Sequence, residues 1–145
     1  MNQFWLIILA LATILRLILI NQSLWLDEAI QGLALMGRMG PLMTYALADF
    51  QPPLYHLIGY LWTQLAGYSE LALRTPSLLS GVATVYFVGK IGELLGGKKV
   101  MYFAALLAAT NPLLIYYSQE GRTYALTAFF VTASMYYYLR LIKQH

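Results

Sequence analysis

Residues 75–92, TPSLLSGVATVYFVGKIG, form an apolar run that contains one charged residue, Lys90. A helix needs about 20 such residues, at roughly 1.5 Å rise each, to cross the hydrocarbon core of a bilayer. Thr75 is placed to cap this helix, and Pro76 suits its first turn, where the missing N–H of proline does no harm. The stretch therefore predicts a membrane-spanning helix and decides the fold class.

Three further stretches are long and apolar enough to span, at residues 4–20, 100–117 and 124–141. Pro112 predicts a kink or an early end in the second of them. The first has no basic segment before it and no suitable cleavage site after it. We therefore expect residues 4–20 to be a retained anchor helix and not a cleaved signal peptide.

The composition excludes most soluble protein classes. Sixty per cent of residues are hydrophobic, 10% are charged, and the mean hydropathy is +0.63. A soluble domain typically has about a quarter of its residues charged. The net charge of +3 is scattered, which argues against nucleic-acid binding, and the absence of cysteine excludes disulfides and Cys-ligated metals.

Two shorter apolar stretches, residues 29–47 and 53–65, are expected to lie at the membrane surface. The first is interrupted by Gly37 and Pro41, and the second would reach only about 20 Å as a helix. We predict an all-α integral membrane protein, a single module over residues 1–145. It would have four spans and two interfacial helices within one external loop, residues 21–74.

The placement of charges supports this topology with the N-terminus inside. The cytoplasmic ends then carry most of the basic residues, in agreement with the positive-inside rule. These residues are Lys90, Lys98, Lys99, Arg140 and Lys143. The external side receives nearly all the acids, which are Asp27, Glu28, Asp49, Glu70 and Glu120.

Asp27 and Glu28 follow the first predicted span directly. Ionisable groups near membrane depth are costly and commonly functional, and a partly desolvated carboxylate suits general-base catalysis. The alternative is structural, with Asp27 as the N-cap of a helix over residues 29–35 and Glu28 in its first turn.

Three other external residues could take part in chemistry. Asp49 precedes the rigid Pro52-Pro53 pair and could be held at a fixed place, or could be a solvated acid. Arg74 and Arg122 suit a lipid phosphate, because guanidinium groups bind phosphate bidentately. Alternatively, Arg74 pairs with Glu70, and Arg122 pairs with Glu120 or with a lipid phosphate.

Two residues favour structural interpretations. Arg16 lies within the first span and is expected to snorkel outward, or else to meet Asp27. His56 is a lone histidine near the start of a short helix, and no His/Asp/Glu cluster has the spacing of a firm metal site.

Four segments together resemble elements of the GT-C membrane glycosyltransferases. The closest likeness is to the bacterial branch related to protein O-mannosyltransferases and the lipid A aminoarabinose transferase. The segments are LWLDEA at residues 24–29, QPPLY at 51–55, ELALRTPS at 70–77 and YYSQEGRTYAL at 116–126. Gln51 stands where the family commonly has histidine. The likeness covers the whole chain but only the N-terminal portion of the family's architecture.

The resemblance implies an inverting transfer of a sugar from a polyprenyl-phosphate donor to a lipid or protein acceptor at the external face. Asp27 would be the general base, supported by Glu28, and Asp49 would orient the acceptor or a metal. Arg74 and Arg122 would hold the leaving phosphate. The same motifs place Gln51, Tyr55 and Tyr124 among the substrate-binding residues.

The resemblance also implies a multi-pass protein of a prokaryotic plasma membrane. Some members of the family use a divalent ion and others do not, so a divalent metal is the one possible cofactor. Two other functions are compatible with the sequence: a non-catalytic membrane subunit that binds a lipid-linked sugar, and a small transporter or flippase component. Transport is disfavoured because the spans carry almost no charge.

Overall fold

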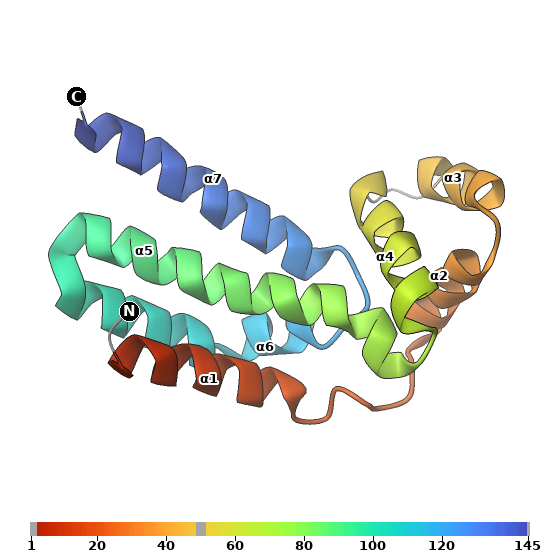
Figure 1. Ribbon diagram of the computed structural model, residues 1–145, viewed down its shortest axis with the longest axis horizontal. Helices are drawn as coiled ribbons and strands as arrows, with labels where there is room; N and C mark the ends of the chain where they lie inside the picture. Colours follow the sequence, from red (N-terminus) through yellow and green to blue (C-terminus); the bar gives the residue numbers. More distant parts are fainter. Residues whose placement is uncertain (1–2, 49–51, 145) are drawn as a thin grey trace.

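The computed structural model describes residues 3–48 and 52–144, and in these ranges it contains seven helices and no strand. Their bounds are α1 Gln3–Leu17, α2 Leu26–Met36, α3 Met39–Ala48, α4 Pro53–Ala66, α5 Glu70–Thr110, α6 Pro112–Ser118 and α7 Tyr124–Gln144. Figure 1 shows α1, α5 and α7 along the long axis, with α2, α3 and α4 grouped at one end. The all-helical prediction is confirmed for the described residues.

α5 consists of two helices that fold back on each other at Gly96 and Gly97, where the backbone is not helical. Gly97 has a φ of +73°, in the left-handed region that glycine adopts at no steric cost. A Cβ on Gly96 would lie 2.4 Å from Val100 Cγ2. The two halves lie side by side in Figure 1, and they correspond to the predicted helices over 75–92 and 100–117.

The start of α5 differs from the prediction that Thr75 caps the helix. The helix begins more than one turn earlier, and the hydroxyl of Ser69 accepts a hydrogen bond from Ala72 N at 3.2 Å. Pro76 therefore lies inside the helix and cannot donate to the carbonyl of Ala72. The indole Nε1 of Trp62 in α4 donates to that carbonyl at 3.0 Å and replaces the missing bond.

Pro112 separates α5 from α6, as the sequence predicts. Because proline has no N–H, the carbonyl of Ala108 loses its usual helical partner. Arg16 donates instead to Ala108 O at 3.4 Å and to Ala109 O at 3.2 Å. The prediction that Arg16 snorkels outward or meets Asp27 is wrong, because its side chain is fully buried and completes this helix end.

α1 packs along both halves of α5 around a core in which four of the eight residues are alanine. The core residues are Trp5, Ile8, Ala12, Val85, Met101, Ala105, Ala108 and Ala109. Gly89 makes room for the indole of Trp5, since a Cβ there would lie 2.2 Å from Trp5 Cη2. Such small residues let membrane helices approach closely. α1 ends at Leu17, before the predicted end at Ile20.

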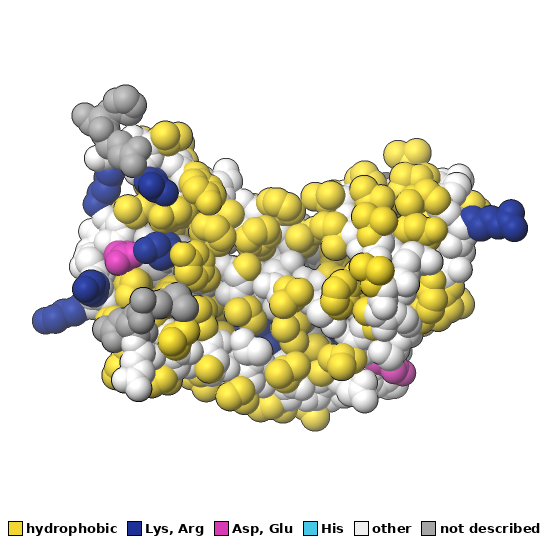
Figure 2. All heavy atoms as spheres, in the orientation of Figure 1, with side chains coloured by type: hydrophobic (Ala, Val, Ile, Leu, Met, Phe, Trp, Pro, Cys, Tyr) yellow, Lys and Arg dark blue, Asp and Glu magenta, His cyan; other side chains and the backbone are white. Residues whose placement is uncertain are grey.

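The surface of the helices is apolar over much of its area, as Figure 2 shows. Large side chains such as Phe4 and Phe103 are 63% and 64% exposed. By length and hydropathy α5 and α7 could cross a membrane, whereas α1 is apolar but shorter. An exposed apolar surface of this extent suits lipid as its solvent.

Three helices, α2, α3 and α4, are present where the sequence predicted two interfacial helices. They pack together as one group. The helix expected over residues 29–47 is interrupted at Gly37 and Arg38, so it becomes α2 and α3. The helix expected over 53–65 is present as α4. α2 and α4 pack closely, because a Cβ on Gly59 would lie 3.1 Å from a methyl group of Leu35. The group holds the first turn of α2 beside the start of α5.

Candidate active site

Asp27 and Glu28 both lie in the first turn of α2, and they have different partners. The expectation that Asp27 caps a helix over residues 29–35 is wrong, because the helix begins at Leu26 with Trp25 as its N-cap residue. The carboxylate of Glu28 accepts the hydrogen bond of Trp25 N at 3.2 Å. Since consecutive helical residues point about 100° apart, Asp27 is directed elsewhere.

Glu28 forms a buried ion pair with Arg74 of α5. The Arg74 and Glu28 side chains are 3% and 2% exposed. Arg74 donates bidentately, from Nε to Glu28 Oε1 at 3.0 Å and from Nη2 to Oε2 at 2.6 Å. It also donates to the carbonyls of Ile20, Gln22 and Ser23. All five N–H groups of this guanidinium are therefore used within the chain.

Glu28 Oε1 also accepts a hydrogen bond from the backbone N–H of Gly121, with an N···O distance of 2.5 Å. Burial by itself raises the pKa of Glu28, but the hydrogen bonds from Arg74, Gly121 and Trp25 outweigh it and lower the pKa below its ordinary value. The ionised carboxylate of Glu28 thus connects α2, α5 and the turn before α7 through its hydrogen bonds. The alternative pairing of Arg74 with Glu70 is not found.

Asp27 pairs with Arg122, in the turn between α6 and α7. Arg122 Nη1 lies 2.7 Å from Asp27 Oδ2, and the two side chains are 22% and 61% exposed. The guanidinium also lies 5.2 Å from the centre of the Tyr124 ring, in cation–π geometry. This second pair is therefore accessible, unlike the pair of Glu28 and Arg74.

The turn that carries Arg122 is fixed at its start by side-chain hydrogen bonds. Ser118 Oγ accepts from Arg16 Nε at 3.1 Å, and the amide of Gln119 donates to backbone carbonyls at the end of α1. A Cβ on Gly81 would lie 1.9 Å from Ser118 Oγ, so glycine is needed there. The sequence pattern gave no reason to select Arg16, Gly81 or Gln119 for this role.

Tyr55 and Ser77 hold the backbone of Arg122. Ser77 Oγ donates to Arg122 O at 3.1 Å and lies 2.9 Å from the hydroxyl of Tyr55. Tyr55 is 2% exposed, and burial raises the pKa of its phenol. Ser77 was missed by the sequence reasoning, although it ends the ELALRTPS element that resembles the family.

Of the three remaining predicted site residues, Tyr124 is described by the structure and the other two are not. Tyr124 is 40% exposed, and its ring packs against that of Tyr117 in a tilted arrangement, with ring centres 4.9 Å apart. Asp49 and Gln51 lie outside the described residues. Within residues 3–48 and 52–144, no three His, Cys, Asp or Glu side chains form a group that could hold a metal ion.

Comparison with models of protein families gives one finding. Residues 50–145, more than half of the chain, match the family described as dolichyl-phosphate-mannose-protein mannosyltransferase. The chain belongs to this family. Membership in this mannosyltransferase family confirms the resemblance to GT-C glycosyltransferases and points to a lipid-linked sugar donor. Comparisons with curated proteins and with solved structures gave no match.

The matched region of this mannosyltransferase-family chain contains Tyr55, Arg74, Arg122 and Tyr124, but it begins after Asp27. The contact between Asp27 and Arg122 joins the segment before the match to the segment within it. Together they form an exposed carboxylate and guanidinium at one end of the helices.

Proposed function

We propose that this chain is a catalytic module of a glycosyltransferase that uses a polyprenyl-phosphate sugar as donor. The sugar passes with inversion to an acceptor at the external membrane face. The observation that carries the proposal is the exposed pair of Asp27 and Arg122 at 2.7 Å, in a chain of the mannosyltransferase family. A general base and a phosphate ligand are the two groups that such a transfer needs.

Arg122 is the better of the two arginines for the donor phosphate. Arg74 has all its N–H groups engaged and is buried, so it acts by holding Glu28 in place. Arg122 makes one hydrogen bond from its guanidinium among the described residues, to Asp27, and remains partly exposed. Its remaining donors can bind two phosphate oxygens in parallel.

Asp27 acts as the base. It removes the proton of the acceptor hydroxyl while the acceptor oxygen attacks the anomeric carbon of the sugar. The bond between that carbon and the phosphate oxygen breaks, and the electron pair leaves with the phosphate. Negative charge therefore develops on the phosphate beside Arg122, where the guanidinium stabilises it.

Other residues support these two. Glu28 fixes the first turn of α2, and Tyr55 with Ser77 fixes the backbone of Arg122. We assign Tyr124 and Gln51 to substrate contacts, and Asp49 to orientation of the acceptor or of a divalent ion, on the family resemblance.

An apolar groove beside Arg122 suits the lipid chain of the donor. A cavity of about 180 Å³ lies between the start of α4 and α7, and Thr123 is among its lining residues. A shallow, open hollow of about 460 Å³ continues along the surface of α7, and the two share Phe130 and Val131. In Figure 2 the hollowed side between the two ends is covered mainly by apolar side chains.

We further propose that residues 1–145 form one module of four spans in the plasma membrane, with a cytoplasmic N-terminus. The spans would be α1, the two halves of α5, and α7, with α6 completing the third. The basic residues at the Gly96–Gly97 end would then face the cytoplasm. Asp27 and Arg122 would face outward.

Two single cysteines test this topology, because the chain has no cysteine of its own. Ala66, at the end of α4, and Lys99, near the Gly96–Gly97 turn, are both exposed. In intact cells a membrane-impermeant maleimide is expected to label Ala66→Cys, and to label Lys99→Cys only after permeabilisation. Labelling of Lys99→Cys in intact cells would overturn the orientation.

Replacement of Arg122 tests the phosphate assignment. Arg122→Gln is expected to weaken binding of a polyprenyl-phosphate mannose by about 10- to 100-fold, the usual range for losing charged hydrogen bonds. Arg38→Gln, at an exposed arginine between α2 and α3, is the matched control and should change nothing. Binding and transfer are measured separately, with purified protein and a radiolabelled donor.

The same assay separates the proposal from its rival. Transfer of label to an acceptor, with inversion at the anomeric carbon, is expected for the unaltered protein. Donor binding without transfer would indicate a non-catalytic subunit and would contradict the catalytic proposal. Unchanged donor binding in Arg122→Gln would contradict the assignment of Arg122 to the donor phosphate.

A further inference from the structure

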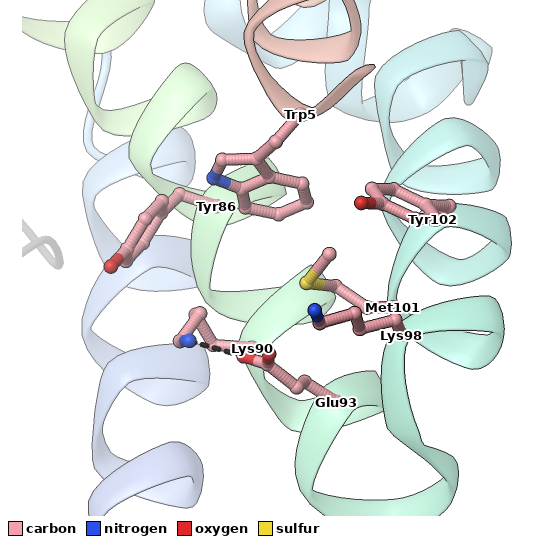
Figure 3. A pocket seen from close by; sticks show the side chains of 7 residues that line it. All are labelled: Trp5, Tyr86, Lys90, Glu93, Lys98, Met101 and Tyr102. Atoms are coloured by element: carbon pink, nitrogen blue, oxygen red, sulfur yellow. Dashed lines mark hydrogen bonds and ion pairs between the residues drawn. The ribbon is translucent and has the colours of Figure 1, made fainter. Parts of the chain in front are cut away.

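A separate pocket of about 230 Å³ lies at the opposite end of the helices from Asp27, beside the Gly96–Gly97 turn. It opens between α1 and the two halves of α5. Figure 3 shows the side chains around it, which are Trp5, Tyr86, Lys90, Glu93, Lys98, Met101 and Tyr102. The mechanism proposed above uses none of these residues.

The inner part of this pocket is apolar and aromatic. Trp5 and Met101 are 4% and 7% exposed, so they form its buried side. The ring of Tyr86 lies 5.8 Å from that of Trp5, and Tyr102 stands on the other half of α5. Trp and Tyr are the residues that concentrate at the boundary between lipid tails and head groups.

The rim of the pocket is charged. Lys90 forms an ion pair with Glu93, and the two side chains are 28% and 31% exposed. Lys98 is exposed and makes no ion pair with the described residues. It is therefore the cation that is available to a ligand.

The surrounding surface adds positive charge. The C-terminal end of α7 meets the Gly96–Gly97 turn of α5 here, and together they also carry Lys99, Arg140 and Lys143. Figure 2 shows Lys and Arg gathered at this end of the molecule. The ammonium group of Lys143 donates to the carbonyl of Leu94, which ties α7 to the pocket's end of α5. Glu93 is the one acid there among the described residues.

We propose that this pocket binds the head group of an anionic phospholipid. The phosphate lies against Lys98, and the glycerol and first acyl carbons lie against Trp5, Met101 and Tyr102. Basic pockets between membrane helices bind anionic head groups in this way. A soluble anion would leave the apolar inner part without a partner, whereas a phospholipid supplies both chemistries in the right order. This site goes beyond the transfer reaction and does not depend on it.

The test compares two adjacent lysines in the full chain. Native mass spectrometry of the detergent-purified protein measures binding of a short-chain phosphatidylglycerol and of the matching phosphatidylcholine. We expect phosphatidylglycerol to bind several-fold more tightly. Lys98→Gln should weaken it roughly fivefold, the effect of one lysine near an anionic lipid. Lys99→Gln removes the same charge outside the pocket and should have little effect, and Lys98→Arg should retain binding.

Three results would overturn the proposal. Equal binding of the two lipids would show no selectivity for an anionic head group. Equal losses in Lys98→Gln and Lys99→Gln would indicate diffuse attraction and no defined pocket. Displacement of phosphatidylglycerol by inorganic phosphate would assign the pocket to a soluble phosphate compound. Circular dichroism confirms that each variant keeps its helices.

Discussion

Asp27→Asn is expected to lower the turnover number for sugar transfer by about 10²- to 10⁴-fold, the usual contribution of a general base. Asparagine keeps the shape of the side chain but cannot accept a proton from the acceptor hydroxyl. Asp27 is 61% exposed, so losing its ion pair with Arg122 changes the free energy of unfolding by at most about 1 kcal/mol. Folding and donor binding should therefore persist.

The measurement is the initial rate of transfer from a radiolabelled polyprenyl-phosphate mannose, with donor binding measured in parallel. Glu70→Gln is the matched control, because Glu70 is a carboxylate in the first turn of α5 that takes no part in the proposed site. Transfer at the normal rate by Asp27→Asn would exclude Asp27 as the base. Loss of activity in both variants would point to a general effect of charge.

Glu28→Gln and Arg74→Gln are expected to destabilise the protein far more than changes at the neighbouring pair. Both side chains are almost fully buried, and removing either partner leaves an uncompensated charge. Such a break typically costs about 3–5 kcal/mol. Asp27→Asn, in the same turn of α2 as Glu28, and Arg122→Gln, in the turn before α7, serve as controls. Denaturant unfolding in detergent, followed by circular dichroism, compares the four variants.

The pH dependence of unfolding gives a second measurement of the same pair. The pKa of Glu28 is lowered in the folded protein, so the folded state binds fewer protons than the unfolded state around that pKa. The stability that Glu28 contributes is complete above its unfolded pKa and is lost as the pH falls through the folded value. Glu28→Gln should lose this acid sensitivity. An identical pH profile in the variant would contradict the assignment.

Most of the helices could be predicted, because local properties define them. Long apolar runs located both halves of α5 and α7, and Pro112 marked the break before α6. The helix predicted over residues 29–47 was wrong in being continuous, because it is divided into α2 and α3. The starts were less accurate. Ser69 competes with Thr75 as an N-cap, and Trp62 compensates for Pro76, so α5 can begin earlier than the proline suggests.

The site could be predicted as a set of residues but not as a set of contacts. Sequence neighbours suggested that Arg74 pairs with Glu70 and Arg122 with Glu120. The structure pairs them with Glu28 and Asp27. Each of these partners lies far away in the sequence, and the direction of each acid depends on where α2 begins.

The hydrogen bonds of Arg16 bear on the order in which the chain is assembled during synthesis. α1 is synthesised before α5. The guanidinium of Arg16 therefore lacks these partners until the segment with Ala108 and Ala109 has been made. In the proposed four-span topology those carbonyls lie in lipid, where backbone groups need internal partners. We therefore expect the end of the α5 hairpin and α1 to depend on each other for stable insertion, and to enter the membrane as one cooperative unit.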